Sequence, residues 1–380
     1  MAELLISAGP GEWRAAWVED GEAVELYVER GDTRLPGSLH LGRVVRVVPA
    51  LDAALVDIGD ERPGFLPLRD VLAESKLEEG ARLVVKVRRE AWADKAPRLT
   101  AKIVDPPAPA PTVEPPAQLF PPPGLAAALA LRLPEAPRRI VADDAGILAE
   151  LRATFPGAEL AQRDPAEWPF DLDTVFDALL SPSLALERGG AVHIEETRTA
   201  TLIDVDTGTP EGGSSARAAL AANRAAARLI ARELRRRNIG GAVVIDFVGL
   251  DRRDHRDQVR QTLEAALARD PAKPQVLGWT RLGHFELTRP RRARSLADAM
   301  LEPGSRAKQP LALAHEALRR VLSEARAEPA ANWQLVVPQA VAAALNGPAA
   351  AALKAVETRL GRRIVVELSA AGAGFDISPV

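Results

Sequence analysis

The spacing of hydrophobic positions separates β-rich parts of the chain from parts that contain helices. Through residues 1–30, short apolar runs are separated by Gly-Pro-Gly and Glu-Asp-Gly, which predicts two or three short strands with turns between them. Five more short runs with intervening turns occupy residues 39–104. This number of strands in so short a stretch is typical of a small barrel of the OB type. We therefore predict an OB-type domain over residues 38–104.

The pattern changes after a proline-rich segment at residues 105–124, which we interpret as a linker. Apolar residues then alternate between strand-like runs and helical spacing, and they are best ordered within residues 186–300. Strand, long helix, strand, helix and strand follow one another there, which indicates a layered α/β domain. After a short linker at residues 301–310, helices and two strands predict a small α+β module over residues 311–380.

Composition excludes several kinds of chemistry. The chain has no cysteine, so disulfides, thiolate zinc sites, cysteine nucleophiles and iron–sulfur clusters are excluded. With 49 basic and 52 acidic residues its formal charge is −3, which argues against a uniformly basic nucleic-acid binder but leaves room for local basic patches. No leader-like start and no apolar run of about 20 residues are present. We expect a cytoplasmic protein without a membrane partner.

Carboxylates stand where two predicted strands end. Asp204 and Asp206 close the run TLIDVD, and Asp246 closes AVVID. Functional groups in α/β sheets gather at strand ends, and carboxylates held close together need a cation to offset their repulsion. Oxygen ligands suit Mg²⁺ or Mn²⁺, and such an ion beside a phosphodiester would activate water. The alternative from spacing alone is that these aspartates cap turns or helices.

Basic residues offer a second set of candidates. The long helix carries arginines at four-residue spacing, among them Arg224 and Arg228, and Arg289 belongs to a cluster near Trp279 and Phe285. Such stripes track phosphates, and basic residues mixed with aromatics suit single-stranded RNA. A solvated arginine face is the competing interpretation. The histidines of this region show no pairing at ligand spacing.

Three stretches resemble the bacterial ribonuclease E/G family. The segment from TLIDVDTG through ARELRRRNIGGAVVIDFVGL to LGHFELTRPRRARSL resembles the catalytic core of that family, and GRVVRVVPALDAALVDIGDERPGFLPL resembles its OB-type domain. The sequence LVVPQAVAAALNGPAAAALKAVETRLGRRIVVEL resembles its small C-terminal domain. The resemblance covers most of the chain in family order.

The resemblance implies a fold and an activity. The fold is multidomain α/β and β. The OB-type barrel is inserted in a ribonuclease H-like domain formed by residues 1–37 and 125–185, and residues 186–300 form a deoxyribonuclease I-like catalytic domain. The implied activity is metal-dependent hydrolysis of single-stranded RNA that leaves 5′-phosphate ends, in RNA processing or decay. The alternative is a weakly active or inactive RNA-binding protein of the same fold.

The family motif also assigns roles to individual positions. It places the metal-binding carboxylates at Asp204 and Asp246, and it has asparagine where this chain has Asp206, which could orient the pair or add a ligand. Stacking residues of the OB-type domain fall on Leu55 and Phe65, so one aromatic is replaced. The phosphate-contacting lysine falls on Lys95, and an arginine of the family's 5′-monophosphate sensor falls on Lys273.

The sequence departs from the family in three places. The proline-rich segment stands where the family carries most of its 5′-sensor domain, so we expect little 5′-monophosphate sensing. The segment LEPGSRAKQP replaces the cysteines that link two chains through zinc, so we expect no zinc and no zinc-linked dimer, and the oligomeric state stays open. We also expect no long tail for degradosome scaffolding.

Overall fold

The computed structural model describes residues 2–30, 36–71, 77–91, 96–104, 112–187, 189–208, 215–291, 293–369 and 374–380. The chain forms two compact units, one made of Met1–Glu29 with Leu129–Val380 and the other of Arg30–Ala128. Within the described ranges, no helix combines the length and the apolar character needed to cross a membrane.

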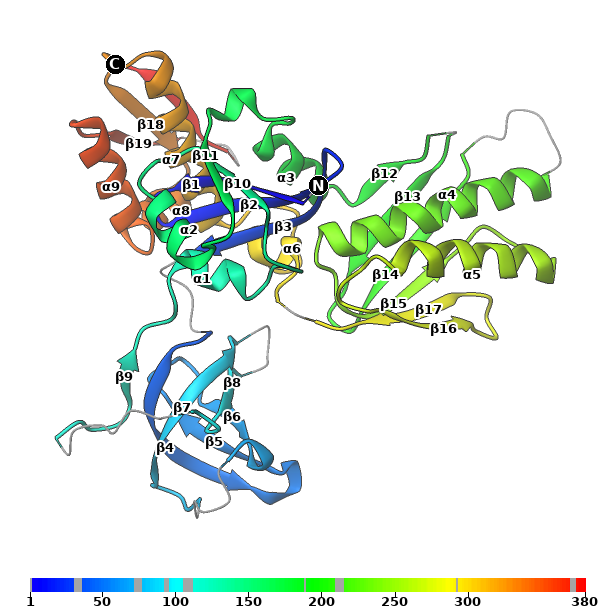
Figure 1. Ribbon diagram of the computed structural model, residues 1–380, viewed down its shortest axis with the longest axis horizontal. Coiled ribbons are helices and arrows are strands. Elements are labelled where there is room, and N and C mark those ends of the chain that lie inside the picture. The colour runs from blue at the N-terminus through cyan, green and yellow to red at the C-terminus, as the bar shows by residue number, and fades with distance from the viewer. Residues whose placement is uncertain are drawn as a thin grey trace. The chain divides into compact units, whose positions relative to one another are not determined.

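The unit Arg30–Ala128 is built on a closed barrel of five strands (Figure 1). The first strand pairs with both the second and the fourth along the chain, which closes the sheet in the order β4-β5-β6-β8-β7. Its interior is filled by buried apolar side chains such as Val56, Leu66 and Leu99. This architecture is consistent with the predicted OB-type fold. The strands are β4 (Leu39–Val48), β5 (Ala53–Asp57), β6 (Gly64–Pro67), β7 (Arg82–Arg89) and β8 (Arg98–Thr100).

Part of the proline-rich segment is more ordered than a linker. Strand β9 (Ala117–Phe120) lies within it and pairs antiparallel with the start of β4. Prolines flank this strand without interrupting it. Among the described strands β9 pairs with β4 alone, so it occupies an edge where proline is tolerated. Helix α1 (Leu125–Ala130) follows it.

The first sheet of the other unit combines segments that are distant in sequence. Its order is β11-β10-β1-β2-β3, and β1 pairs in parallel with β10. Apolar side chains on one face pack against helix α3, with Leu5, Val141 and Phe176 in one buried cluster. The elements are β1 (Glu3–Gly9), β2 (Glu12–Glu19), β3 (Glu22–Arg30), β10 (Arg139–Ala142), α2 (Leu148–Thr154), β11 (Glu159–Gln162) and α3 (Leu172–Leu180).

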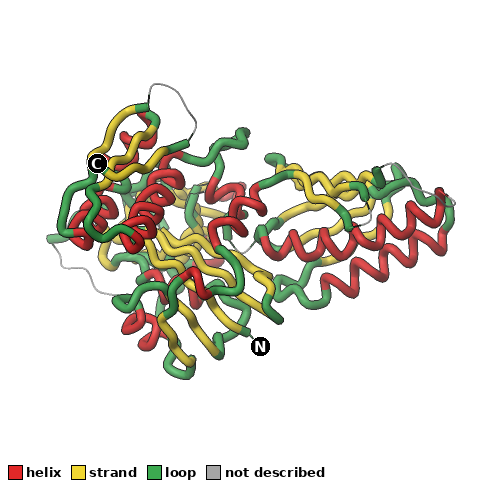
Figure 2. The backbone as a smooth tube through the Cα atoms, turned by 90° about the horizontal axis from the view of Figure 1, so that it is seen from above, coloured by secondary structure: helices red, strands yellow, loops and turns green. Residues whose placement is uncertain are grey.

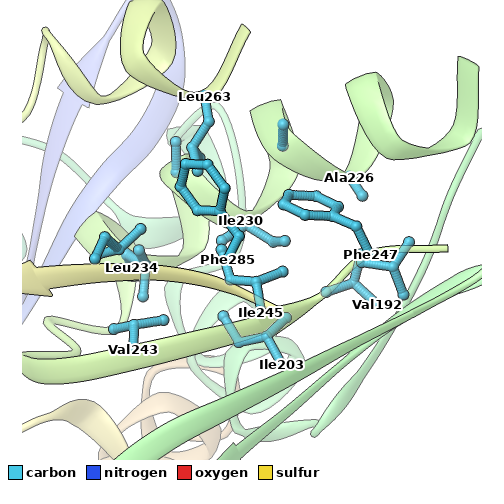
Figure 3. Close-up of a cluster of buried hydrophobic side chains, with 14 of the residues drawn as sticks. Val192, Ile203, Ala226, Ile230, Leu234, Val243, Ile245, Phe247, Leu263 and Phe285 are labelled. Atoms are coloured by element: carbon cyan, nitrogen blue, oxygen red, sulfur yellow. The ribbon is translucent and has the colours of Figure 1, made fainter. Parts of the chain in front are cut away.

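A six-stranded mixed sheet forms the next layer, in the order β12-β13-β14-β15-β17-β16. Helices α4 and α5 lie side by side over one of its faces (Figures 1 and 2). Figure 3 shows the core between helices and sheet, where Ile230 and Leu263 meet Ile203, Ile245 and Phe285. The elements are β12 (Ser183–Ala185), β13 (Ala191–Glu196), β14 (Ala200–Asp206), α4 (Ser215–Arg236), β15 (Gly241–Asp246), α5 (Arg253–Leu267), β16 (Gln275–Trp279) and β17 (Phe285–Arg289).

The C-terminal part is a small α+β layer in which strand β18 lies between β19 and β20. A buried ion cluster joins this layer to the first sheet, because Arg319 of α7 pairs with Glu12 of β2, which also pairs with Arg14. Helix α6 (Leu296–Met300) precedes this layer and buries Leu296 and Met300 in the core of the first sheet. The elements of the layer are α7 (Pro310–Ala327), β18 (Trp333–Val337), α8 (Gln339–Asn346), α9 (Ala350–Leu360), β19 (Val365–Leu368) and β20 (Asp376–Pro379).

Candidate active site

The two faces of the six-stranded sheet differ in chemistry because strand side chains alternate. In β14 and β15 the buried residues Ile203, Val205 and Ile245 face the helices. The intervening Asp204 and Asp246 are exposed, so they project from the opposite face. The helices therefore cover one side of the sheet, and the predicted carboxylates occupy the other.

Asp204 and Asp246 are direct partners in the register of the sheet. Strands β14 and β15 run parallel, and Asp204 is paired with Asp246 at the end of that ladder. Neighbouring strands lie about 4.8 Å apart, so two carboxylates on adjacent strands and one face share a small space. The structure thus brings together the two residues that the sequence singles out.

Two histidines extend this pair into a row, one in strand β13 and the other directly before strand β17. His193 of β13 is paired with Asp204 in the antiparallel register. On the other side, the Nε2 atom of His284 lies 3.7 Å from Oδ2 of Asp246. His193 is itself fixed by a 2.8 Å hydrogen bond between its Nδ1 atom and the Ser183 hydroxyl. The row His193–Asp204–Asp246–His284 defines what we call the acidic sheet face.

Sequence spacing could not reveal this row. Three of its members come from separate strands and His284 directly precedes a fourth, and the histidines stand far apart along the chain. The signal available in the sequence is the alternation of polar and apolar residues within each strand. In β13, His193 and Glu195 are exposed on one face, whereas Val192 and Ile194 are buried on the other. Only the pairing register brings that face beside the aspartates.

The donor set matches one mode of divalent-ion binding. Among the described residues, no group of three or more His, Cys, Asp or Glu side chains is arranged to hold a metal ion. Mg²⁺ is commonly bound in proteins by only one or two carboxylates, with waters and substrate phosphates completing its shell. The Asp204–Asp246 pair fits that mode. Asp206 lies two residues further along the same face, and its Oδ1 atom accepts a 2.9 Å hydrogen bond from the Gly208 amide.

The barrel carries a mixed apolar and basic row on its outer side. Leu55 and Phe65 are direct cross-strand partners, both half-buried, while their neighbours Ala54, Val56 and Leu66 fill the interior. Arg46 is paired with Leu55, and Arg98 with Phe65. The structure therefore places the two predicted stacking positions side by side with a guanidinium on each flank. Lys95 lies outside the described residues.

The other predicted contacts lie in different surroundings. Arg224 and Arg228 are exposed on α4, and Lys273 is exposed in the turn after α5. Arg289 is buried instead, with its Nε atom 2.7 Å from Oδ2 of Asp270. Its guanidinium also donates to the carbonyl of Ile239. Arg289 is thus engaged inside the protein, and its contact with RNA stays a prediction.

Fold and site together define a multidomain α/β protein with a closed five-stranded barrel and an acidic sheet face. Comparison with known proteins points to one family. The model of the ribonuclease E/G family matches residues 152–292, which contain the whole acidic sheet face. Together with the relatives described next, this match supports assignment of the chain to the ribonuclease E/G family.

Relatives align along most of the chain. Ribonuclease G of Escherichia coli is 24% identical, and the alignment covers 97% of each protein. Ribonuclease G of Haemophilus influenzae is 25% identical over 79% of this chain and 82% of its own length. Ribonuclease E of Synechocystis is 26% identical over 80% of this chain and 59% of its own. The first alignment extends over 481 positions against 380 residues here, so that relative has segments which this chain lacks.

Proposed function

We propose that the protein is a metal-dependent endoribonuclease that hydrolyses single-stranded RNA and leaves 5′-phosphate ends, acting in RNA processing or decay in the cytoplasm. The observation that carries the proposal is the register pairing of Asp204 with Asp246 on an open sheet face, inside the segment that matches the family model. The names of the relatives add support, since they are ribonucleases G and E.

The proposed domain organisation follows the same family. Residues 1–37 with 125–185 would form a ribonuclease H-like domain, which is supported by the parallel pairing of β1 with β10. Residues 38–104 would form the OB-type domain, 105–124 and 301–310 the linkers, and 311–380 the small C-terminal domain. Residues 186–300 would form a deoxyribonuclease I-like catalytic domain, supported by the six-stranded sheet with helices on its other face.

The chemistry follows from what the acidic sheet face offers. Bound at Asp204 and Asp246, Mg²⁺ or Mn²⁺ would supply a water of lowered pKa and would neutralise charge on the phosphoryl oxygens. The two carboxylates hold the site at one end of the β14–β15 ladder, and His284 flanks Asp246. A 5′-phosphate product requires that the oxygen of water bonds to phosphorus while the bond to the 3′ oxygen breaks and that oxygen leaves with a proton.

Binding of the substrate is proposed for the outer side of the barrel. The Leu55–Phe65 pair provides an apolar platform on which bases can stack, and Arg46 and Arg98 can contact phosphates. Lys95 and Lys273 keep their proposed contacts with RNA. Lysine at the sensor position retains charge but lacks the two-pronged geometry of arginine, which supports weak 5′-monophosphate sensing. Without cysteine, a dimer would form without a thiolate zinc link.

Cleavage of a defined single-stranded RNA tests the proposal. With Mg²⁺, we expect the wild-type protein to produce fragments that a 5′-phosphate-dependent exonuclease degrades. Asp246→Asn should slow cleavage at least about 100-fold, as expected for loss of a group that acts in the transition state. Asp257→Asn, a matched change at an exposed position of α5, serves as the control. Equal rates for both variants, or no cleavage by the wild type, would refute the proposal.

Two observations favour a second candidate, an RNA-binding protein with little or no cleavage. An aliphatic residue, Leu55, stands where the family resemblance implies an aromatic, and the chain lacks segments found in a full-length relative. RNA binding without turnover in either Mg²⁺ or Mn²⁺ would establish this alternative.

A further inference from the structure

A groove with a basic rim lies on the helix-covered side of the six-stranded sheet. It is bounded by α4 and α5 and at one end by Glu19 and Val24 of β2 and β3, and its volume is about 690 Å³. Because α4 and α5 pack on the face of the sheet opposite to Asp204 and Asp246, this groove is separate from the acidic sheet face. We call it the helix groove.

The charge of the helix groove is unbalanced. Its two acidic members are already engaged, since Glu19 pairs with Arg235 and Asp270 with Arg289, each at 2.7 Å. The exposed guanidinium groups of Arg224, Arg228 and Arg269 also line the groove. Across the described part of the chain, none of these three forms an ion pair or hydrogen bond with another side chain. The groove therefore offers a set of cations whose counter-charge must come from outside the protein.

The spacing of these cations is regular. Arg224 and Arg228 are four residues apart on α4, so one lies about 6 Å beyond the other on the same face. Arg232 continues the row at the same interval, although it also pairs with Glu233 at 3.6 Å. A regular row of cations suits an anion whose charges also repeat along a chain. A single compact anion would need the cations to converge instead.

The remaining lining suits a nucleic-acid backbone. Ala231, Ala265 and Ala266 have small side chains between the two helices, so a ligand can approach closely there. Gln258 and Gln261 on α5 face the groove across from the arginines and supply neutral donors and acceptors of the kind that contact phosphate and sugar. An acidic peptide would pair with the arginines, but its carboxylates would make fewer contacts with the amide groups of Gln258 and Gln261 on the other wall.

We infer that the helix groove binds the sugar–phosphate backbone of single-stranded RNA, at a segment other than the one presented to the acidic sheet face. This inference rests on the proposed function for the identity of the ligand as RNA. Its consequence is that RNA long enough to reach both sites binds more tightly than a fragment that occupies one.

The test is equilibrium binding of a fluorescently labelled 20-nucleotide RNA, followed by anisotropy in EDTA so that no cleavage occurs. The variant is Arg224→Gln with Arg228→Gln, and the control is Arg260→Gln with Arg320→Gln, which removes two exposed arginines outside the groove. Each lost phosphate contact on a single strand lowers the salt slope by about 0.7 and the affinity by about fivefold at 0.1 M salt. We therefore expect about 25-fold weaker binding for the groove variant and a slope reduced by about 1.4.

Two further variants keep the test decisive. Arg224→Lys with Arg228→Lys retains both charges and should bind within about threefold of the wild type, while Gln261→Glu adds a negative charge to the opposite wall and should weaken binding. If the groove variant binds RNA like the control, with the same salt slope, the inference is overturned. It is also overturned if the variant loses affinity for polyglutamate but not for RNA, which would identify an acidic protein as the ligand.

The result of this binding test does not depend on whether the protein cleaves RNA. Failure of Asp246→Asn to reduce cleavage would refute the proposed active site and leave the binding result intact. Conversely, unchanged RNA binding by the groove variant would refute the helix groove as a binding site and would leave the proposed active site standing.

Discussion

Replacement of Asp270 by asparagine should destabilise the unit that contains the six-stranded sheet. Asp270 and Arg289 form a buried ion pair, with side chains 2% and 3% exposed and N–O distances of 2.7 and 3.3 Å. Removing one partner of a buried pair leaves the other charge uncompensated, which costs about 3–5 kcal/mol. Arg289 retains its bonds to Asn238 and Ile239 at 3.2 and 3.0 Å, so we expect the lower end, about 3 kcal/mol.

Thermal unfolding followed by tryptophan fluorescence measures this effect. A loss of about 3 kcal/mol corresponds to a midpoint about 6–12 °C lower in a domain of this size class. Asp254→Asn, which removes an acid from an exposed pair with Arg252, is the matched control and should leave the midpoint unchanged. Asp270→Leu with Arg289→Met should be less destabilising than Asp270→Asn, because no buried charge is left alone. A midpoint for Asp270→Asn within 2 °C of the wild type would refute this reasoning.

Three other predictions concern different parts of the fold. Gly190→Ala should destabilise the protein more than Gly189→Ala, because both have positive φ but only at Gly190 would a Cβ lie 2.1 Å from a carbonyl oxygen at the end of β14; equal midpoints in thermal unfolding would contradict this. Phe65→Ala should weaken RNA binding by about 1–3 kcal/mol per stacked base with little loss of stability. Leu66→Ala, in the barrel core, should instead lower the free energy of unfolding by about 2–5 kcal/mol. The reverse pattern would place Phe65 in the core. Burial lowers the pKa of His40 from 6.5. The barrel should therefore be most stable above about pH 6.5 and lose stability as the pH falls through the folded-state pKa. If the unfolding free energy falls as steeply between pH 7 and 5 in His40→Gln as in the wild type, this assignment is contradicted.

Local patterns predicted the elements better than their long-range contacts. The five short runs of residues 39–104 form the strands of the closed barrel, and the long helical pattern forms α4. Both predictions depend on the spacing of apolar residues, which can be read directly from the sequence. Strand β9 was not predicted, because proline suppresses strand signals and edge pairing with β4 depends on a partner far away in sequence.

The site shows the same limit. Alternation indicated that Asp204 and Asp246 stand at strand ends, but their direct pairing follows from the parallel register of β14 and β15. Arg289 looks like the other arginines of its cluster in sequence, and its burial against Asp270 is seen only in the structure. The helix groove combines cations of α4 with uncharged residues of α5, a combination that appears only when the two helices pack together.

The most direct measurement of the central claim is a double-mutant comparison of RNA cleavage in saturating Mg²⁺. If Asp204 and Asp246 form one catalytic site, Asp204→Asn and Asp246→Asn should each slow cleavage at least about 100-fold, and the double variant should be no slower than either single variant, because residues that act as a unit are not additive. A double variant whose rate is the product of two separate effects, or a wild-type rate in either single variant, would contradict the account.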